Sequence, residues 1–292
     1  MRPRSRFLRL NRLRHHLLEW GTRGEPVLLL HGFLEHAHAW DFVAPALAAA
    51  GRRVFAIDWR GHGQTQWIGD GGYYHFPDYV ADLGFVVRAL GGHAALVGHS
   101  MGAGAAILYA GTEPDRVTAL ACIEGLGPAD MGIDSAPERY STWIGDLQRG
   151  AQREARTLDS IESTAARLRE RFPRFSMEVA HHMAKHATKP AGSARAWRFD
   201  PLHQTRAPQP YLVEQARAFW QRIRCPVLFV EGEASSIRRL IPGIDERVRA
   251  LGAEHVTLAD CAHHPHLEKP AETAKRLDDF LSRISSRDRR RA

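Results

Sequence analysis

The five residues Gly98-His99-Ser100-Met101-Gly102 follow an apolar run at 94–97 and precede a run of small residues at 103–106. This order predicts a strand, a sharp turn and a helix, with the serine at the apex of the turn. Such a turn strains the serine backbone and crowds the positions two residues away on either side, so both are glycine. The pattern Gly-x-Ser-x-Gly is that of a nucleophile elbow, although five residues alone also fit an unreactive glycine-rich turn.

Further apolar runs predict more strands of the same sheet, each buried on both faces. The runs occupy residues 26–30, 54–57, 117–123, 226–230 and 256–258, after an opening hairpin within 6–20. Helices are expected at 41–50, 77–90, 101–112, 244–251 and 270–284. Because strands and helices alternate along the chain, we expect a doubly wound α/β fold with a mostly parallel sheet.

The segment from about 125 to 222 has a different character, because strand patterns vanish and apolar residues recur at helical spacing. One such helix face comprises Ile161, Ala165, Leu168 and Phe172. We therefore expect a core formed by residues 1–126 and 222–292, with a helical insertion at 127–221 between the sixth and seventh strands.

Composition and charge exclude several classes of protein. The formal net charge is +7, but the basic residues concentrate near the ends, at 1–14 and 283–291, and form no stripe with interleaved aromatic residues. That pattern argues against nucleic-acid binding. No apolar run approaches the length of a membrane span, and the basic start lacks the apolar segment of a signal peptide.

An odd number of cysteines in apolar contexts predicts free thiols in a reducing compartment: Cys122, Cys225 and Cys261. We expect a cytoplasmic protein with a small-molecule substrate and neither a nucleic-acid nor a membrane partner, and the oligomeric state stays open.

Four motifs, in chain order, resemble those of the α/β-hydrolase fold family. They are His31-Gly32-Phe33, Asp58-Trp59-Arg60-Gly61-His62-Gly63, the elbow at 98–102, and the segment Ala262-His263-His264-Pro265-His266-Leu267-Glu268-Lys269-Pro270. The resemblance covers nearly the whole chain and implies the fold already expected. The insertion at 127–221 takes the position of that family's cap domain. The chain looks most similar to serine hydrolase-like proteins, and more distantly to haloalkane dehalogenases.

The resemblance assigns the nucleophile to Ser100 and the general base to a histidine within 262–270. A serine hydroxyl is a weak nucleophile at neutral pH and needs such a base within hydrogen-bond reach. By its place in the motif His263 is the expected base, with His264 and His266 as alternatives. A serine nucleophile argues against dehalogenase or epoxide hydrolase chemistry, which in this fold normally uses an aspartate.

The acid of the triad does not stand at the usual place. The turn after the seventh strand reads Gly232-Glu233-Ala234-Ser235-Ser236, so Ser235 fills the position of the usual aspartate. Glu124 ends the sixth strand, where some family members carry the acid, and a glutamate there needs a partner because the strand is otherwise apolar and buried. We therefore expect Glu124 to be the triad acid, with Glu233 or a missing acid as alternatives.

The resemblance also implies an oxyanion hole formed by the backbone amides of Phe33 and Met101. Substrate pockets are mostly apolar and aromatic, which makes a small set of residues candidates for the pocket wall. These candidates are His31, Trp59, Tyr74, Trp143 and Trp197.

A pair of histidines on a predicted helix has the spacing of zinc ligands. His182 and His186 are four residues apart, but the sequence offers no third ligand that can be placed beside them. The pair is therefore interpreted as part of a solvated helix face. We expect neither a metal ion nor an organic cofactor.

These observations predict a serine hydrolase that cleaves a carboxylic ester, or a related acyl bond, of a small and largely apolar substrate through an acyl-enzyme. Thioester, lactone or carbon–carbon bond hydrolysis would use the same residues. A protein of this fold that binds a small ligand without catalysis is the alternative from a different class, because fold does not fix function.

Overall fold

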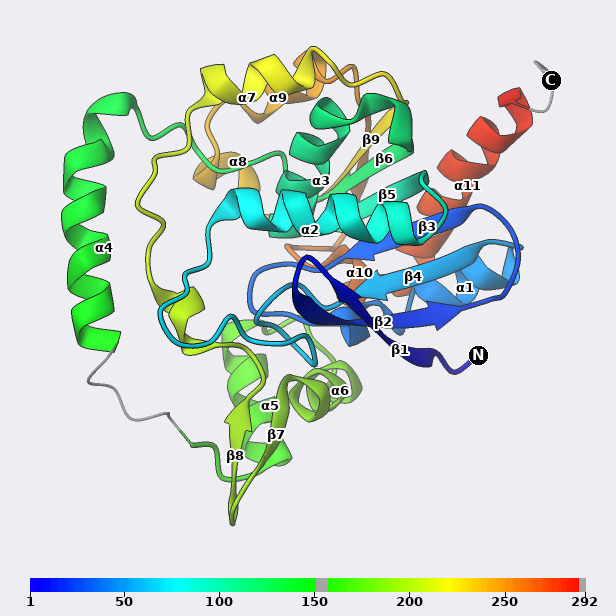
Figure 1. Ribbon diagram of the computed structural model, residues 1–292. Helices are drawn as coiled ribbons and strands as arrows, with labels where there is room; N and C mark the ends of the chain where they lie inside the picture. The colour runs from blue at the N-terminus through cyan, green and yellow to red at the C-terminus, as the bar shows by residue number, and fades with distance from the viewer. Residues whose placement is uncertain (151–156, 289–292) are drawn as a thin grey trace.

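The central sheet of the computed structural model, which describes residues 1–150 and 157–288, has eight strands in the order β1-β2-β4-β3-β5-β6-β9-β10 (Figure 1). Their bounds are β1 Arg4–Leu10, β2 Leu13–Trp20, β3 Pro26–Leu30, β4 Arg53–Ile57, β5 Ala94–His99, β6 Val117–Ile123, β9 Val227–Gly232 and β10 Glu254–Leu258. The pairs β1-β2 and β2-β4 are antiparallel, and the other neighbouring pairs of this sheet are parallel. The predicted doubly wound, mostly parallel sheet is confirmed.

Helices cover both faces of the sheet (Figure 1). One face packs against α2 (Phe76–Ala89), α3 (Met101–Thr112), α7 (Val213–Trp220), α8 (Ile237–Leu240) and α9 (Ile244–Ala250), and the other against α1 (Ala44–Ala49) and α11 (Pro270–Asp288). Successive strand residues point to opposite layers, so in β3 Leu28 and Leu30 join the first core cluster and Val27 and Leu29 the second. This double burial explains why the inner strands read as unbroken apolar runs.

The chain between β6 and β9 forms α4 (Ala136–Gly150), α5 (Ile161–Arg171), α6 (Met177–Ala187), the hairpin of β7 (Thr188–Ala191) and β8 (Ala194–Trp197), and α7. The predicted face of α5 packs against α6, and this small cluster also contains Ala39 and Leu267 from outside the insertion. Apolar burial therefore holds α5 and α6 to the rest of the protein.

Two features of this segment differ from the sequence-based expectation. The sequence predicts a helical insertion without strands, so the β7-β8 hairpin is a correction to it. Its strands are only four residues long and have no buried face of alternating apolar residues, so they leave no strand pattern in the sequence. Helix α7 was assigned to the insertion, but it buries Ala216 and Trp220 in the core cluster beside α3. The apolar residues of α7 have the same helical spacing as those of the inserted helices. This spacing shows that a helix packs on one face, but it does not identify the part of the protein on which that face packs.

The three cysteines are unpaired, with Cys122 and Cys261 buried and Cys225 half-buried. Among the helices of the described residues, none combines the length and the apolar character needed to cross a lipid bilayer.

Asp58, directly after β4, organises the turns at the carboxyl edge of the sheet. Its buried carboxylate accepts hydrogen bonds from the backbone amides of Ala37 (2.7 Å) and Gln64 (2.8 Å) and from Nδ1 of His16 (2.7 Å). Burial by itself would raise the pKa of Asp58, but the hydrogen bond and charge of His16, with the nearby His31, hold that pKa well below its usual value. The carboxylate is therefore charged in the folded protein and joins three chain segments.

We expect Asp58→Asn to lower the free energy of unfolding by about 3 kcal/mol at neutral pH, because an amide cannot accept from all three donors. Since the pKa of Asp58 is lower in the folded state, its contribution is present above pH ~4 and is lost as the pH falls below that value. The free energy of unfolding, measured with urea between pH 7 and pH 2, should therefore depend less on pH in the variant than in the parent protein. Asp279→Asn, which removes an exposed ion pair with Lys275 on α11, should change this pH dependence much less, because solvent screens the pairing that lowers the pKa of Asp279. Identical pH dependence of Asp58→Asn and the parent protein would contradict this role.

Candidate active site

Ser100 occupies a strained turn between β5 and α3. Its backbone angles are φ 49° and ψ −111°, a region that non-glycine residues rarely adopt, and its amide donates to the carbonyl of Ile123 at 2.9 Å. A β-carbon at Gly98 would lie 2.4 Å from the amide nitrogen of Ala103, and one at Gly102 would lie 2.3 Å from the carbonyl oxygen of Leu30. Both flanking glycines are therefore sterically required, and the turn has the geometry of an elbow that projects Ser100 from the sheet edge.

His263 and Glu124 meet beside this turn. His263 lies in the loop after β10, 42 % exposed, and its Nδ1 is 3.2 Å from Oε2 of the fully buried Glu124. The Glu124 carboxylate also accepts from the amide of Gly232 at 2.6 Å and from the hydroxyl of Ser235. Three donors therefore compensate the burial of this charge, as a carboxylate in an apolar setting requires.

The other acid weighed from the sequence lies elsewhere. The side chain of Glu233 is exposed and accepts from the amide of Asp260 at 3.2 Å. Ser235, at the position of the usual aspartate, donates to the same Glu124 oxygen that His263 contacts. The structure thus brings Glu124, and not Glu233, to His263.

The turn after Glu124 is packed directly on the elbow. Glu124 itself has a positive φ of 52°, and a β-carbon at Gly125 would lie 2.5 Å from the carbonyl oxygen of Ser100. Only a residue without a side chain fits this contact. The ends of β5 and β6 therefore fix the positions of Ser100 and Glu124 relative to each other.

Ser100, Glu124 and His263 line one cavity of about 330 Å³. Its remaining walls are mainly apolar and comprise Phe76, Met101, Gly104, Gly125, Gly127, Pro128, Ile237, Leu240 and Ile241. The other two candidate bases, His264 and His266, are buried and face Glu35 instead. Of the three histidines considered, His263 is the one at the cavity.

The two expected oxyanion donors have different surroundings. Met101 is the first residue of α3, so its amide belongs to the helix N-terminus, where N–H groups lack partners within the helix. Phe33 lies in the turn after β3, and its half-exposed side chain is not part of the described lining of the cavity. Glu35 ties that turn to the elbow, since it accepts from the amide of Gly32 at 2.9 Å and pairs with His99, the residue before Ser100.

The five residues proposed for the pocket wall do not line this cavity. Trp59 is buried beneath the turn after β3, where its indole donates to the carbonyl of His31 at 3.0 Å and its amide to Nε2 of the same histidine at 3.1 Å. The hydroxyl of Tyr74 donates to Asp200 at 2.8 Å. These three side chains therefore serve structural contacts.

The two remaining pocket candidates lie on the insertion. Trp143 on α4 packs against Tyr73, with ring centroids 5.4 Å apart, and Trp197 on β8 stacks on Phe199, also at 5.4 Å. Aromatic residues fill cores and hairpins as readily as pockets, so their presence in the sequence did not indicate which surface they would meet. The aromatic wall of the cavity is Phe76 instead.

A buried ion pair beneath the site was not anticipated from the sequence. His99 contacts Glu35 with its Nδ1 at 3.2 Å and the carbonyl of His263 with its Nε2 at 2.8 Å. Burial would lower the pKa of His99, but Glu35 outweighs it and raises that pKa, while His99 holds the pKa of Glu35 well below its usual value. A buried histidine in an apolar strand was the available signal, but nothing in the sequence identified Glu35 as its partner. The pair positions the backbone of His263.

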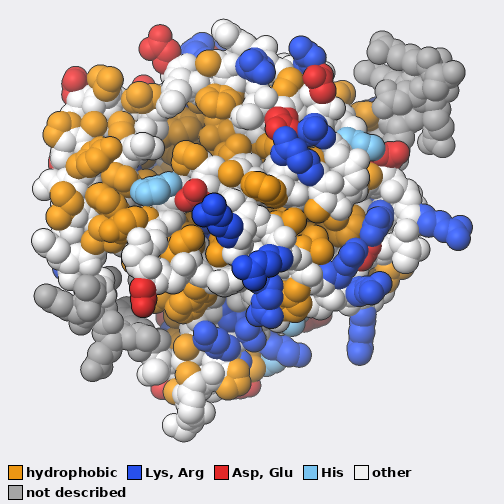
Figure 2. All heavy atoms as spheres, viewed as in Figure 1, with side chains coloured by type: hydrophobic (Ala, Val, Ile, Leu, Met, Phe, Trp, Pro, Cys, Tyr) orange, Lys and Arg blue, Asp and Glu red, His pale blue; other side chains and the backbone are white. Residues whose placement is uncertain are grey.

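An apolar groove of about 630 Å³ adjoins the cavity and shares Phe76 and Pro128 with it. Figure 2 shows hydrophobic side chains around a hollow in this region, between α2 and α7. Two helix faces run from the cavity into the groove: Phe76, Val80 and Gly84 on α2, and Gly104, Leu108 and Thr112 on α3. At 1.5 Å per residue, each face extends about 12 Å away from Ser100.

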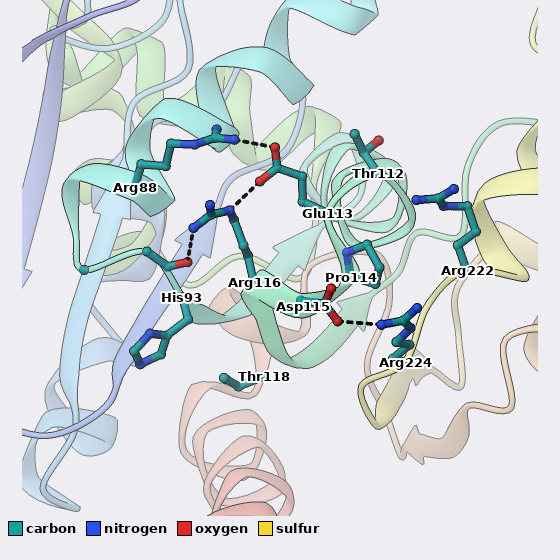
Figure 3. A pocket seen from close by; sticks show the side chains of 12 residues that line it. Arg88, His93, Thr112, Glu113, Pro114, Asp115, Arg116, Thr118, Arg222 and Arg224 are labelled. Carbon is teal, nitrogen blue, oxygen red and sulfur yellow. Dashed lines mark hydrogen bonds and ion pairs between the residues drawn. The ribbon is translucent and has the colours of Figure 1, made fainter.

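A third hollow, of about 830 Å³, is rich in arginine and lies at the opposite edge of the sheet (Figure 3). Its residues come from the end of α2, the loop before β5, the end of α3 and the turn after it, the start of β6 and the segment before β9. Arg88 and Arg116 pair with Glu113, and Arg224 pairs with Asp115. Because ligands of open α/β sheets bind at the carboxyl ends of the strands, this hollow is not the place of the chemistry.

Comparison with known proteins agrees with this architecture. Residues 25–270 match the family model described as alpha/beta hydrolase fold. A serine hydrolase-like protein of Dictyostelium discoideum is 23% identical over 90% of this chain and 77% of its own length. A monoacylglycerol lipase of Mycolicibacterium smegmatis is 29% identical, covering 89% of this chain and 88% of the lipase. Among solved structures, a thioesterase domain from the curacin biosynthetic pathway superposes with a TM-score of 0.82 at 28% identity, over 94% of this chain and 98% of that domain.

Proposed function

The chain belongs to the alpha/beta hydrolase fold family, and on that premise we propose that it is a serine hydrolase that cleaves carboxylic esters or related acyl bonds through a Ser100-His263-Glu124 triad. The observation that carries the proposal is the contact of 3.2 Å between His263 and the buried Glu124, in the same cavity as the strained Ser100. The similarity to a lipase and a thioesterase supports acyl transfer as the reaction class.

In the first half-reaction the hydroxyl oxygen of Ser100 attacks the acyl carbon. His263 accepts the hydroxyl proton at Nε2, the ring nitrogen that Glu124 does not contact, and the negative charge moves onto the carbonyl oxygen. The amides of Met101 and Phe33 donate to that oxygen. The bond to the leaving group then breaks, and the leaving group takes the proton from His263, which leaves an acyl ester on Ser100.

In the second half-reaction water attacks the acyl-enzyme. His263 removes a proton from the water, the tetrahedral intermediate collapses, and the proton returns to Ser100 as the carboxylic acid departs. Glu124 stays ionised throughout and accepts from Nδ1–H, which fixes the tautomer of His263 and stabilises the imidazolium that forms in each half-reaction. The hydrogen bonds from Gly232 and Ser235 keep the carboxylate pointed at the histidine.

A panel of nitrophenyl esters and acyl thioesters, combined with a fluorophosphonate probe, tests this function. We expect turnover of at least one acyl series and one covalent probe per chain, with competition between probe and substrate. Folded protein that neither turns over any member of the panel nor reacts with the probe would instead support the non-catalytic ligand-binding alternative.

We propose that the apolar groove holds the acyl chain of the substrate. Support comes from its shared wall with the cavity and from the helix faces of α2 and α3, which lead away from Ser100. An apolar chain in the groove would be removed from water over about 12 Å, and each buried methylene contributes about 0.8 kcal/mol. Medium or long acyl chains should therefore be preferred over acetyl.

We further propose that the part of the insertion from 127 to 212 acts as the cap over this substrate path. Gly127 and Pro128 border the cavity, and Met131, Arg139 and residues 207–212 border the groove. Helix α7, which packs on α3, is then part of the core.

Val80→Trp should block the groove one helical turn from Phe76. We expect kcat/KM for a decanoyl ester to fall by about 10- to 100-fold, because the acyl chain loses its apolar surroundings, while acetyl ester hydrolysis changes little. Ala89→Trp is the matched control, since residue 89 is exposed at the end of the same helix and outside the groove lining. An equal loss for both chain lengths, or no loss for decanoyl, would contradict the assignment of the groove.

A further inference from the structure

The structure brings two residues from the start of the chain to the histidine pair on α6. His38 belongs to the short helix η1 (Ala37–Trp40) and Asp41 follows it, and both lie beside His182 and His186. One nitrogen or carboxylate oxygen from each of the four residues lies within 4.8 Å of the corresponding atoms of the others. We refer to His38, Asp41, His182 and His186 as the histidine cluster.

The four side chains already contact one another. Nδ1 of His38 is 2.9 Å and Nε2 of His182 is 3.2 Å from the same oxygen of Asp41. The ring of His186 stacks on that of His38, with centroids 3.6 Å apart. Three imidazoles and one carboxylate therefore lie side by side, and Nε2 of His182 is also 3.1 Å from the carbonyl oxygen of His38, a contact that it would exchange for the ion.

One polar atom of the cluster is buried without a protein partner. The second oxygen of Asp41, Oδ1, has no hydrogen bond among the described residues. Buried polar atoms are nearly always paired, because an unpaired one loses its hydrogen bonds to water without replacement. This unpaired oxygen points to a missing ligand.

The chemistry of the four side chains suits a cation. Imidazole nitrogens and carboxylate oxygens are the protein groups that ligate metal ions of the zinc class.

We propose that His38, Asp41, His182 and His186 form a binding site for one divalent transition-metal ion of the zinc class. Three nitrogens and one oxygen are a ligand set that Zn²⁺ takes in tetrahedral geometry. Around such an ion at about 2.1 Å, neighbouring ligand atoms lie about 3.4 Å apart. The four ligand atoms now lie within 4.8 Å of one another, so binding would draw the most distant of them together by up to about 1.4 Å. Ca²⁺ and Mg²⁺, which require oxygen ligands, do not fit.

The position of the site implies a structural role. η1 ends at Trp40, well before the insertion begins at residue 127, whereas α6 lies within the insertion. A bound ion would therefore join these two parts of the chain by direct bonds. Apolar contacts of Ala39 with the α5-α6 cluster already bring these elements together. Because the ion binds the assembled site and not the separated segments, it stabilises the attachment of the insertion. None of the four residues lines the cavity at Ser100, so the inference does not rest on the proposed function.

The test uses the full chain, freed of any affinity tag and treated with a chelator, titrated with Zn²⁺ and with Co²⁺. We expect one ion per chain, a raised melting temperature with Zn²⁺, and a visible absorption spectrum of tetrahedral type with Co²⁺. His186→Gln should weaken Zn²⁺ binding by about 100-fold or more, because loss of an outer partner alone costs 10–100-fold. His181→Gln is the matched control, since this exposed histidine is on the same helix but outside the cluster, and it should bind Zn²⁺ as the parent does.

Asp41→Asn keeps the shape of the side chain and should also weaken Zn²⁺ binding. If circular dichroism shows that His186→Gln is unfolded in the presence of chelator, Asp41→Asn takes its place in the comparison with His181→Gln. Equal effects of His181→Gln and His186→Gln, binding of Ca²⁺ or Mg²⁺ as tightly as Zn²⁺, or the absence of stoichiometric Zn²⁺ binding would overturn the proposal. Each of these results is independent of reaction with a fluorophosphonate.

Discussion

Ser100→Ala is expected to lower kcat for ester hydrolysis by a factor on the order of 10⁶, the scale on which loss of a serine nucleophile acts in a related triad. The variant keeps the amides of the oxyanion hole and the His263-Glu124 pair, but no side chain remains to form the acyl-enzyme. Any residual rate comes from direct attack of water on the bound substrate. The melting temperature should stay close to that of the parent, because alanine replaces only the hydroxyl at the same backbone angles.

The measurement is a pre-steady-state assay of released nitrophenol together with labelling by a fluorophosphonate. The parent should carry the label on Ser100, and the variant should give neither a burst nor a label. Ser236→Ala is a matched control, since it removes a half-buried serine hydroxyl from the loop after β9 and leaves the cavity lining intact. Labelling of the Ser100→Ala protein at another residue of the cavity would show that the nucleophile has been misassigned.

Glu124→Gln should lower kcat by about 10²–10⁴-fold while the protein stays folded. The buried carboxylate accepts from Gly232, Ser235 and His263 at once, and an amide has only one acceptor oxygen. The glutamine NH₂ group would therefore face at least one other donor. It also carries no charge to stabilise the imidazolium of His263.

Two further variants separate this role from simple structural damage. Glu233→Gln should leave kcat unchanged, because that side chain is exposed and does not contact His263. The double variant Glu124→Gln/Ser235→Asp should recover part of the lost kcat. The hydroxyl of Ser235 contacts the same Glu124 oxygen as His263, so a carboxylate at residue 235 would lie close to the imidazole. It would also stand at the position where the family usually carries the acid. Full activity of Glu124→Gln, or an equal loss in Glu233→Gln, would remove Glu124 from the mechanism.

Local patterns were enough to predict the core of the fold. The elbow, the unbroken apolar runs and the alternation of strands with helices are features of neighbouring residues, and parallel sheets buried on both faces leave a strong signal. The pairing of Glu124 with a remote partner was also foreseeable, because a glutamate at the end of a buried apolar strand needs compensation. The identity of that partner as His263 came from family resemblance rather than from the spacing of residues.

Features that depend on distant segments escaped prediction. The aromatic residues proposed for the pocket are held by partners such as Asp200 and Phe199, which no local pattern connects to them. The two residues that complete the histidine cluster, His38 and Asp41, lie more than 140 residues before His182, so the helical spacing of His182 and His186 could not reveal them. The same holds for Glu35 beneath the elbow, since its partner His99 is 64 residues away.

The placement of the insertion has a consequence for the order of folding. β6 and β9 are neighbours in the sheet although about 100 residues separate them. Closing a loop of that length costs about 4 kcal/mol of chain entropy, and this cost is offset only after the two strands have formed their contacts. β10 adds only to β9, and the His263 loop follows β10. The strands up to β6, with the elbow, can assemble from contacts that are closer along the chain and therefore faster to form. The Glu124 carboxylate and the His263 imidazole meet only when β6 and β9 have paired. The proposed triad is therefore completed late in folding, and it is disrupted as soon as these two strands separate.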